Sequence, residues 1–301
     1  MSKAITKNKI QKSRQDKMFD FIIYAVAVLL IVITVYPMYF IVIASISNPT
    51  DVSSGNILFW PKGINMRGYE QLLNYQQLWT GYKNTIIYTV LGTCANLVVN
   101  ISASYALSRK NLVGKKLITF FYLIPMFFGG GLIPTYLIVR NFHLLDTRWV
   151  MILPFSVITY YIIVGRTFFS NNIPDDLWEA AQIDGCGNLN FFFKIVLPLS
   201  KAVIAVIALW SAVGHWNSYF NALIYLRNEM YQPLQIVLRN ILINNQTASM
   251  MMTGTAATEA RQAAELIKYG AIVVSSAPIM CMYPFVQKYF NQGVMIGAVK
   301  G

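Results

Sequence analysis

Charged residues are scarce in this chain, and so are histidine and cysteine. Of its 301 residues, 12% are Asp, Glu, Lys or Arg, against about 25% in typical soluble domains, while 56% are apolar. This balance excludes an intrinsically disordered chain and argues against an ordinary soluble enzyme of this length. Two histidines cannot build a multi-histidine metal site. Three cysteines far apart in the sequence give neither a disulfide framework nor a metal-ligand spacing.

Motifs of common enzyme classes are absent as well. The sequence contains no G-x-x-x-x-G-K-[ST] phosphate loop, no H-E-x-x-H zinc motif and no G-x-S-x-G nucleophile motif. We therefore expect no catalytic residues in this chain, and no metal or cofactor, ATP included, bound by it.

The chain instead has long apolar stretches without charge. A helix needs about 20 apolar residues, with a range of about 17–25, to cross the hydrocarbon core of a membrane. The sequence therefore predicts an all-α, polytopic integral membrane protein, with six transmembrane helices in a domain over residues 21–290. The six charge-free stretches are 21–50, 84–108, 117–139, 149–165, 202–226 and 269–287.

Three details of these stretches matter for the topology. The first is longer than the h-region of a cleavable signal peptide, which has about 7–15 residues, so it is expected to be retained. The third holds Pro125, Gly129–Gly131 and Pro134, which indicate either a kink that aids packing or a hinge or cavity wall. Residues 240–258 also lack charge, but their many Asn, Thr and Ser residues are costly to bury in lipid, so we assign 227–268 to a long external loop.

Basic residues are distributed unevenly around the six stretches. With six crossings, 15 of the 24 Lys and Arg residues lie on the side of the N-terminus and nine on the other. The positive-inside rule then predicts a multi-pass protein of the plasma membrane with both termini cytoplasmic, namely a basic tail over 1–20 and a tail over 291–301. The net charge of +12 thus indicates orientation against membrane lipid, and no nucleic-acid partner is expected.

The absence of charge also bears on how the protein is driven. Proton- and ion-coupled pumps usually need ionisable groups at membrane depth, and the six stretches hold no Asp, Glu, Lys or Arg. The chain therefore either conducts passively or takes its energy from a partner.

One cytoplasmic loop, residues 173–200, has helical signals of its own. Pro174 suits a first helical position, acidic residues follow in the first turns, and Gly185 suits a left-handed C-terminal cap, so a helix over 174–184 is predicted. Asn188 is expected to N-cap a second short helix.

This second helix is expected to end before Leu197-Pro198. An alternative interpretation of the loop is an amphipathic hairpin that lies on the lipid through Phe191, Phe192 and Phe193.

Seven positions of the loop fit the pattern E-A-A-x3-G-x9-I-x-L-P. This pattern resembles the EAA loop of permease subunits of type-I ABC importers, where the loop is a coupling helix that docks into a groove on the ATPase. The resemblance implies that Glu179 pairs with a basic group of the ATPase and that Gly185 allows the turn. The ATPase-coupling residues would be Glu179, Ala180, Ala181, Asp184, Gly185, Ile195, Leu197 and Pro198.

The resemblance extends over most of the chain, with a permease core over 80–290. Stretches such as GGGLIPTYLIVRNFHLLDTRW and YPFVQKYFNQGVMIGAVKG look like the carbohydrate-importer branch. They are similar to the smaller maltose-transporter permease and more so to the aldouronate- or lipoprotein-type polysaccharide permeases. The resemblance implies a second homologous permease, a cytoplasmic ATPase dimer that holds ATP and Mg, an extracytoplasmic sugar-binding lipoprotein and an oligosaccharide substrate.

Polar and aromatic side chains within the fifth and second stretches suit a path for a neutral sugar. Aromatic faces bind the C–H surfaces of sugars, and amides or hydroxyls bond their hydroxyl groups. The alternative is that the same side chains hold membrane helices together. The candidate path residues are His215, Trp216, Asn217, Tyr219, Asn221 and Asn100.

Other functions remain open at this point. Within the importer class the cargo is either an oligosaccharide or another small solute. A passive channel or secondary transporter would need no ATPase. A membrane-embedded enzyme acting on lipid-linked sugars would need clustered acids, and the one such cluster, Asp175, Asp176 and Asp184, lies inside the EAA-like loop.

Overall fold

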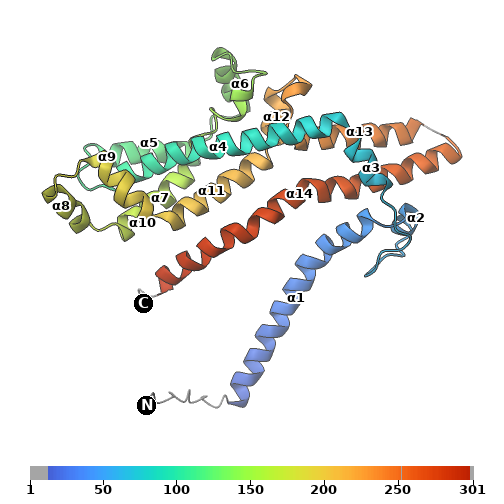
Figure 1. The fold of residues 1–301 in the computed structure, drawn as a ribbon, viewed down its shortest axis with the longest axis horizontal. Coiled ribbons are helices and arrows are strands. Elements are labelled where there is room, and N and C mark those ends of the chain that lie inside the picture. Colours follow the sequence, from blue (N-terminus) through green and yellow to red (C-terminus); the bar gives the residue numbers. More distant parts are fainter. Residues whose placement is uncertain (1–12, 252, 299–301) are drawn as a thin grey trace.

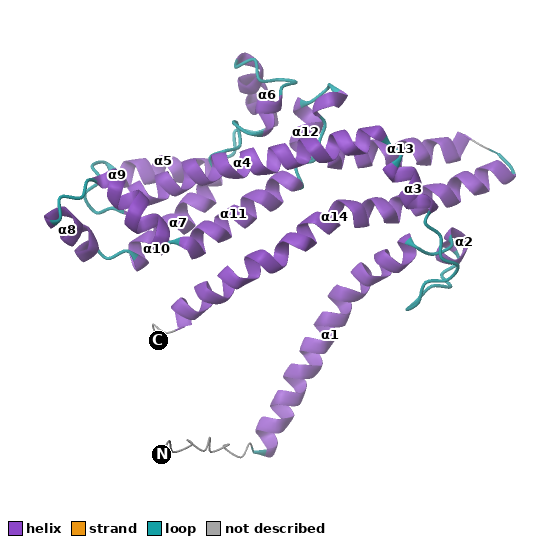
Figure 2. Cartoon of the chain, viewed as in Figure 1, coloured by secondary structure: helices purple, strands orange, loops and turns teal. Residues whose placement is uncertain are grey.

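The computed structural model describes residues 13–251 and 253–298, and this part of the chain contains helices and loops but no strand (Figures 1 and 2). The longer helices are α1 (Arg14–Ser45), α4 (Gln76–Ser108), α5 (Lys115–Phe127), α6 (Leu132–Asn141), α7 (Thr159–Asn172), α11 (Lys201–Trp216), α13 (Leu234–Met251) and α14 (Thr255–Ala298). The short helical elements are α2 (Pro49–Ser53), α3 (Arg67–Leu73), η1 (Arg148–Met151), α8 (Asp175–Ile183), α9 (Asn188–Phe191), η2 (Phe192–Val196), α10 (Leu197–Leu199), α12 (Phe220–Tyr225) and η3 (Glu229–Tyr231).

Three described helices are long and apolar enough to cross a membrane: α1, α4 and the 260–282 part of α14. The count rises to five if each of two sharply bent pairs is one span. All six predicted stretches contain helix, so the all-α membrane class is confirmed, whereas the count of six crossings stays a prediction. The tail predicted over 291–301 is helical as far as Ala298, and residues 1–12 and 299–301 lie outside the described part.

The third predicted crossing, 117–139, is not one continuous helix. The axes of α5 and α6 differ by 116°, with the break at the glycine run that ends in Gly131. Gly131 has φ +83°, which a residue with a side chain rarely adopts. The break is therefore sharper than either a packing kink or a hinge in a continuous crossing, and α6 projects from the bundle beside α12 (Figure 1).

Two further predicted crossings are interrupted. In 149–165, η1 is followed by irregular backbone, and α7 starts only at Thr159. Its 14 residues give about 21 Å of helix. In 202–226, α11 ends at Trp216 and α12 starts at Phe220. Charge-free length identified these segments correctly as apolar, but it carries no information about where the backbone leaves the helix.

The prediction of a loop over 227–268 is wrong as to secondary structure, whereas its external position stays a prediction. Most of this range is helical, in α13 and the first part of α14. Four apolar residues at helical spacing, Leu234, Val237, Leu238 and Ile241, are buried in one cluster with Leu72 and Trp216. The amides that argued for a loop bond within the helix, as Asn245 Nδ2 does to the carbonyl of Ile241 at 2.8 Å. The amphipathic pattern outweighs the average polarity of the segment.

Helix α4, of 33 residues, carries a buried row of small and polar residues spaced by four. Such a row is inclined to the helix axis, so it meets different neighbours along its length. In this bundle α4 packs against α13, α11 and α7. The row consists of Asn84, Tyr88, Gly92, Asn96, Asn100, Ser104 and Ser108.

Side chains of this row bond to backbone groups where other segments are irregular. Asn84 Nδ2 donates to the carbonyls of Met230 and Gln232, at 2.8 and 3.0 Å. Asn100 donates to the carbonyl of Ser156 at 2.8 Å and accepts from the N–H of Ile158 at 2.9 Å. Unsatisfied backbone groups are costly away from water, so these amides stabilise the breaks before α13 and α7.

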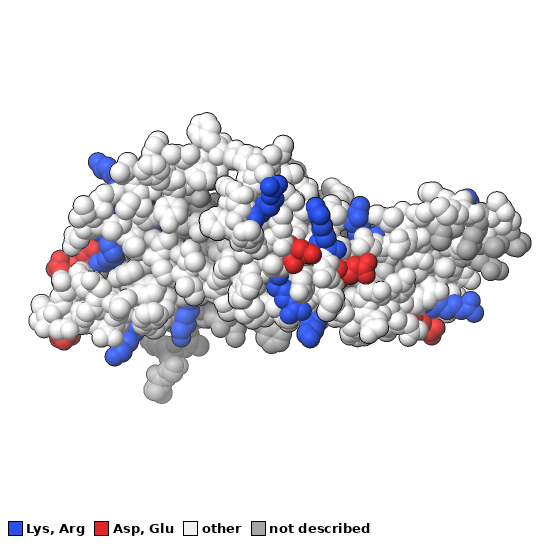
Figure 3. Space-filling model, turned by 90° about the horizontal axis from the view of Figure 1, so that it is seen from above, with Lys and Arg blue, Asp and Glu red and all other residues white. Residues whose placement is uncertain are grey.

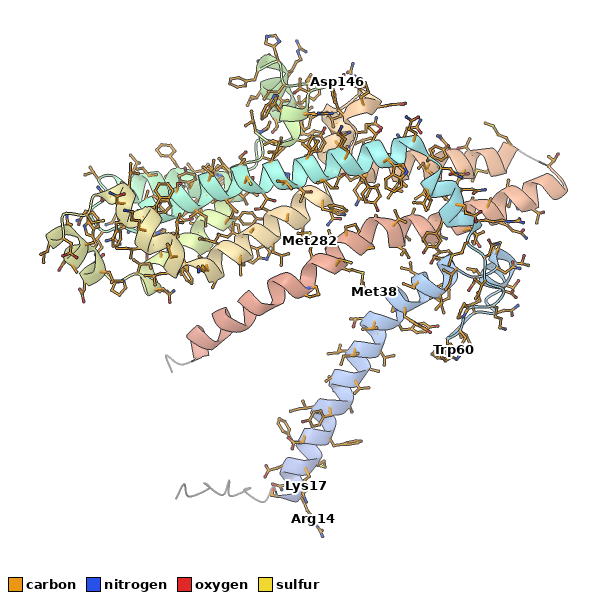
Figure 4. All side chains as sticks on the ribbon, in the orientation of Figure 1. Arg14, Lys17, Met38, Trp60, Asp146 and Met282 are labelled. Carbon is orange, nitrogen blue, oxygen red and sulfur yellow. The ribbon has the colours of Figure 1, made fainter. Side chains whose placement is uncertain are left out.

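The segment after α6 is attached to α12 by Asp146, which lies between the two helices (Figure 4). Its Oδ1 accepts from the backbone N–H groups of Arg227 and Asn228, at 3.0 and 2.8 Å. Asp146 itself has φ +56°, a conformation that aspartate tolerates better than most residues. The two projecting elements therefore form one connected structure.

Helix α1 is attached at one end only. Its last residues, Ile43 and Ala44, are buried, whereas most of the helix from Met18 to Val42 is exposed. Towards its N-terminus α1 diverges from α14, and Arg14 and Lys17 lie at the far end (Figure 4). The apolar surface of α1 is therefore available to lipid or to another chain.

Gly92 provides a stability prediction, because α4 approaches His215 of α11 at this position. A Cβ on Gly92 would lie 2.4 Å from ring atoms of His215. We expect Gly92→Ala to destabilise the purified protein by about 1–3 kcal/mol through overpacking, measured as a lower midpoint of thermal unfolding in detergent.

Gly214→Ala is the matched control for this variant, since a Cβ there meets nothing within 4 Å. Equal midpoints for Gly92→Ala and Gly214→Ala would contradict the close approach of α4 and α11. Truncation of the ring in Gly92→Ala/His215→Ala should recover part of the loss.

Candidate functional site

The loop with the EAA-like pattern protrudes from one end of the bundle, where α8, α9 and α10 lie together (Figure 1). Helix α8 starts at Asp175, one residue later than predicted, with Pro174 at its N-cap. It ends at Ile183, and Gly185, two residues later, has φ +72°, the left-handed conformation predicted for it. The N–H of Gly185 donates to Gln182 at 3.0 Å, and that of Cys186 donates to Ala181 at 2.8 Å. These two bonds form a Schellman motif, which closes the helix.

The second half of the loop differs from its prediction. Asn188 is the first residue of α9 rather than its N-cap, and no side chain caps this helix. The helical run does not end before Leu197 but continues through a π-helical turn, Phe192–Val196, into α10. In this turn the N–H of Leu197 donates to the carbonyl of Phe192, five residues earlier. The wider turn leads into Pro198, which has no N–H to donate.

Apolar packing fixes the orientation of α8 against the bundle. Trp178 meets Phe191 edge-on, with ring centroids 5.0 Å apart. Phe191 is fully buried, and Ala181 is buried beside it, in a cluster that includes Phe169 of α7 and Ile101 of α4. The loop is thus packed on helices that run into the membrane domain, rather than attached only through the chain.

Ion pairs hold the start of α8. One oxygen of Asp175 lies 3.2 Å from Arg109 Nη2, and the other lies 2.8 Å from Lys110 Nζ. The hydrogen bond from Lys110, together with the positive charges of Lys110 and Arg109, lowers the pKa of Asp175 below its usual value. Arg109 also lies over the ring of Phe191, 6.0 Å from its centroid. At this end of the molecule acidic and basic side chains lie together, whereas most of the visible surface is uncharged (Figure 3).

The outward surface of the loop combines one acid with several apolar side chains. Glu179 and Ala180 are exposed, and the structure gives Glu179 no ion-pair partner among the described residues. Ile183 is 88% exposed and Leu189 is 75% exposed. Exposed apolar side chains around a free carboxylate, on a rigid protrusion, fit a contact with another protein. Asp184 is exposed beside them, while Ile195 and Leu197 are half-buried and Pro198 is exposed.

Three of the candidate path residues have packing roles. Trp216 is buried, and its Nε1 donates to the carbonyl of Ser275 at 2.9 Å, which joins α11 to α14. Asn100 is fully buried and donates both amide hydrogens within the protein, to Asn96 and Ser156. Tyr219 packs against the cluster around Tyr88.

Of the other three candidate path residues, one is exposed to solvent and two line a pocket. Asn217 is exposed and donates to the carbonyl of Val213 in its own helix at 3.0 Å. His215 and Asn221 line a pocket of about 110 Å³ between α4, α7 and α11. Asn96 of the second stretch, which also suits a sugar path by its residue type, lines the same pocket. The pocket residues that sequence reasoning did not propose are Met151, Phe155, Ile158, Tyr161, Ser211, Gly214 and Ser218.

A helical spacing explains why this pocket is polar. Ser211, His215 and Ser218 follow one another at four and three residues, so they share a face of the helix and its end. Across from them, Asn96 Oδ1 is buried without a partner, and Asn96 Nδ2 lies 3.3 Å from Ser211 Oγ. The spacing of Ser211, His215 and Ser218 can be read from the sequence. The sequence does not show that this face of α11 packs against α4. Among the described residues, no group of three or more His, Cys, Asp or Glu is arranged to hold a metal ion.

The ion pairs of Asp175 lead to a prediction about the loop. Asp175→Asn removes the charge that holds Arg109 and Lys110, so residues 175–186 should exchange their amide hydrogens faster at neutral pH, as measured by mass spectrometry. Asp176→Asn is the control, since Asp176 is exposed and makes no ion pair among the described residues.

The effect of Asp175 also has a defined pH dependence. Because the pKa of Asp175 is lowered in the folded state, its contribution is present above its unfolded pKa and is lost as pH falls through its folded pKa. The difference in stability between wild type and Asp175→Asn should therefore disappear in acid. A difference independent of pH would contradict the ion-pair assignment.

Comparison with known proteins identifies the chain's relatives. Residues 101–296 match the family described as "Binding-protein-dependent transport system inner membrane component". The polygalacturonan/rhamnogalacturonan transport system permease protein YtcP of Bacillus subtilis is 35% identical over 289 residues, which are 95% of this chain and 100% of YtcP. Protein LplC of Bacillus subtilis is 36% identical over 270 residues, 89% of this chain and 90% of LplC.

A solved structure has the same fold. It comes from the crystal structure of a bacterial ABC transporter involved in the import of the acidic polysaccharide alginate, with a TM-score of 0.83 and 31% identity, and the match covers 94% of this chain and 100% of that one. With the protruding loop and the polar row of α4, these matches make the assignment plain: the chain belongs to the family of inner-membrane components of binding-protein-dependent transport systems.

Proposed function

We propose that this chain is a translocating subunit of an ATP-driven importer for oligosaccharides. The observation that carries the proposal is the rigid protruding loop, whose exposed Glu179 lies on a helix packed against α4 and α7. The names of the relatives support a saccharide cargo, since YtcP is named for polygalacturonan and rhamnogalacturonan and the solved relative for alginate.

In this proposal the loop transmits force from a separate ATPase. The apolar cluster around Phe191 joins α8 to α4, and the ion pairs of Asp175 join α8 to the segment that follows α4. Movement of an ATPase surface bound to Glu179 would therefore move these helices together, as expected when a rigid element joins two bistable parts. ATP and Mg would be held by the ATPase dimer.

Further partners are inferred from the exposed apolar surfaces. Helix α5 has no buried residue, and α1 is exposed along most of its length. Such surfaces fit membrane lipid and a second, homologous permease. An extracytoplasmic binding lipoprotein would deliver the cargo at the opposite end from the loop. Both termini would be cytoplasmic, as the uneven distribution of basic residues predicts.

The pocket between α4, α7 and α11 suits the passage of uncharged parts of a sugar. Its lining offers hydroxyl and amide groups from Asn96, Ser211 and Asn221, aromatic faces from Phe155 and Tyr161, and no Asp, Glu, Lys or Arg. A few placed polar groups among apolar and aromatic side chains are typical of small-molecule sites.

Uptake measurements test the proposal as a whole. Purification through this chain should yield a stoichiometric ATPase and a second permease, and proteoliposomes of the complex with its binding protein should accumulate labelled oligosaccharides only with ATP. Accumulation without ATP would favour a channel or secondary transporter. ATP-dependent uptake of a different small solute, with no saccharide of a glycan panel accepted, would contradict the cargo.

Glu179→Ala tests the coupling role. Since Glu179 is exposed, its loss should leave folding and assembly intact but abolish most of the cargo-stimulated ATP hydrolysis. The loss should be about tenfold or more if one charge-assisted contact of about 1.5–3 kcal/mol is removed. Glu229→Ala, at an exposed acid of η3 remote from the loop, is the control. Unchanged stimulation in Glu179→Ala would refute the role.

A further inference from the structure

A second pocket, here called the outer pocket, lies far from the coupling loop. It is an open hollow with a volume of about 510 Å³, lined by α2, α13 and the first part of α14. These elements lie at the opposite end of the bundle from α8 (Figure 1). Pockets of about 300–1,000 Å³ are the size that holds small ligands.

Six of the eleven residues that line the outer pocket are polar but neutral. Hydroxyl and amide side chains of this kind bond sugar hydroxyls. Here they come from α2 and its end and from the consecutive helices α13 and α14, which are distant from α2 in sequence. The neutral polar residues are Thr50, Ser53, Ser54, Gln246, Thr258 and Gln262.

Cross-links between α2 and α14 hold this lining in position. Gln262 Nε2 donates to Thr50 Oγ1 at 3.0 Å. Ser53 Oγ donates to Glu265 Oε2 at 2.5 Å. The rim is therefore ordered by side-chain bonds before any ligand arrives, which lowers the entropic cost of binding.

Charged groups distinguish the outer pocket from the membrane pocket between α4, α7 and α11. Arg261, Glu265 and Lys268 line the outer pocket, and their spacing of four and three residues puts them on one face of α14. Glu265 is bonded to Ser53, whereas Arg261 and Lys268 have no carboxylate partner among the described residues. Lys268 Nζ lies 4.7 Å from the ring centroid of Tyr269. The three charges leave a net positive pocket with two cations available to a ligand.

We infer that the outer pocket is a subsite for an acidic oligosaccharide. In it Arg261, assisted by Lys268, binds the carboxylate of one uronate residue, and the neutral rim bonds the sugar hydroxyls. Arginine binds carboxylates through two parallel hydrogen bonds, which explains a cation at this position better than a role in solubility. The inference rests on the proposed import function and specifies its cargo. It also assigns charge recognition to the outer end of a chain whose membrane pocket is uncharged.

The test compares two sugars of the same linkage that differ only in the group at C6. Trigalacturonate carries a carboxylate on each residue where galactotriose carries a hydroxymethyl group. ATP-dependent uptake of both labelled sugars is measured with the complete importer in proteoliposomes, for wild type and for Arg261→Gln/Lys268→Gln. We expect the KM for trigalacturonate to rise about tenfold or more, as befits the loss of charge-assisted bonds, and the KM for galactotriose to change less than about twofold.

Two further variants act as controls, one that should strengthen the binding of the acidic sugar and one that should leave it unchanged. Glu265→Gln retains an acceptor for Ser53 but removes the negative charge, so it should lower the KM for trigalacturonate. Arg239→Gln changes a basic residue of α13 that does not line the pocket, and it should alter neither KM.

Each other outcome overturns the inference. An equal rise in KM for both sugars would assign the two cations to folding or to docking of the binding protein. Unchanged values for trigalacturonate would remove the site altogether. If the wild-type importer takes up galactotriose but not trigalacturonate, the proposed function stands and this inference is overturned. Wild type that takes up no saccharide would overturn both.

Discussion

The buried polar row of α4 is the constraint on which the rest of the bundle depends. Helices in lipid satisfy their own backbone groups, but every break in a helix exposes N–H and C=O groups that need partners. This chain has breaks before α7 and before α13, and in both places an asparagine of α4, Asn100 or Asn84, bonds to the freed backbone. The row therefore supplies the hydrogen-bond partners that these two irregular segments need.

The same row determines where the packing is tight and where space remains. At Gly92 the absence of a side chain lets His215 approach α4. One turn further on, Asn96 leaves its oxygen without a protein partner beside the membrane pocket. Close packing at Gly92 and a polar cavity at Asn96 thus follow one another on the same face of α4, because these two residues, one turn apart, have different side chains.

How much of this was predictable depends on which physical signal each residue gives. The cap at Gly185 followed from local sequence, since a helix end is decided by a few neighbouring residues. The membrane class followed from charge-free length. The helical hairpin of α13 and α14 was missed because Asn245 and its neighbours were judged by their polarity, although Leu234 and Ile241 had helical spacing. The membrane pocket could not be predicted, because it needs Ser211 and Asn96 to face each other, and no local signal pairs two helices.

The π-helical turn at Phe192–Val196 has a consequence for how this loop can vary. A π turn contains one residue more than the α-helical path, and each residue rotates the remainder of the helix by about 100°. Deleting a single residue from this turn would leave the loop helical but would point Ile195 and Leu197 in a different direction from the bundle they now contact. The length of the nine-residue interval between Gly185 and Ile195 therefore determines which way Ile195 and Leu197 point. Substitutions within the interval preserve the rotation of the following helix about its axis, whereas insertions and deletions change it.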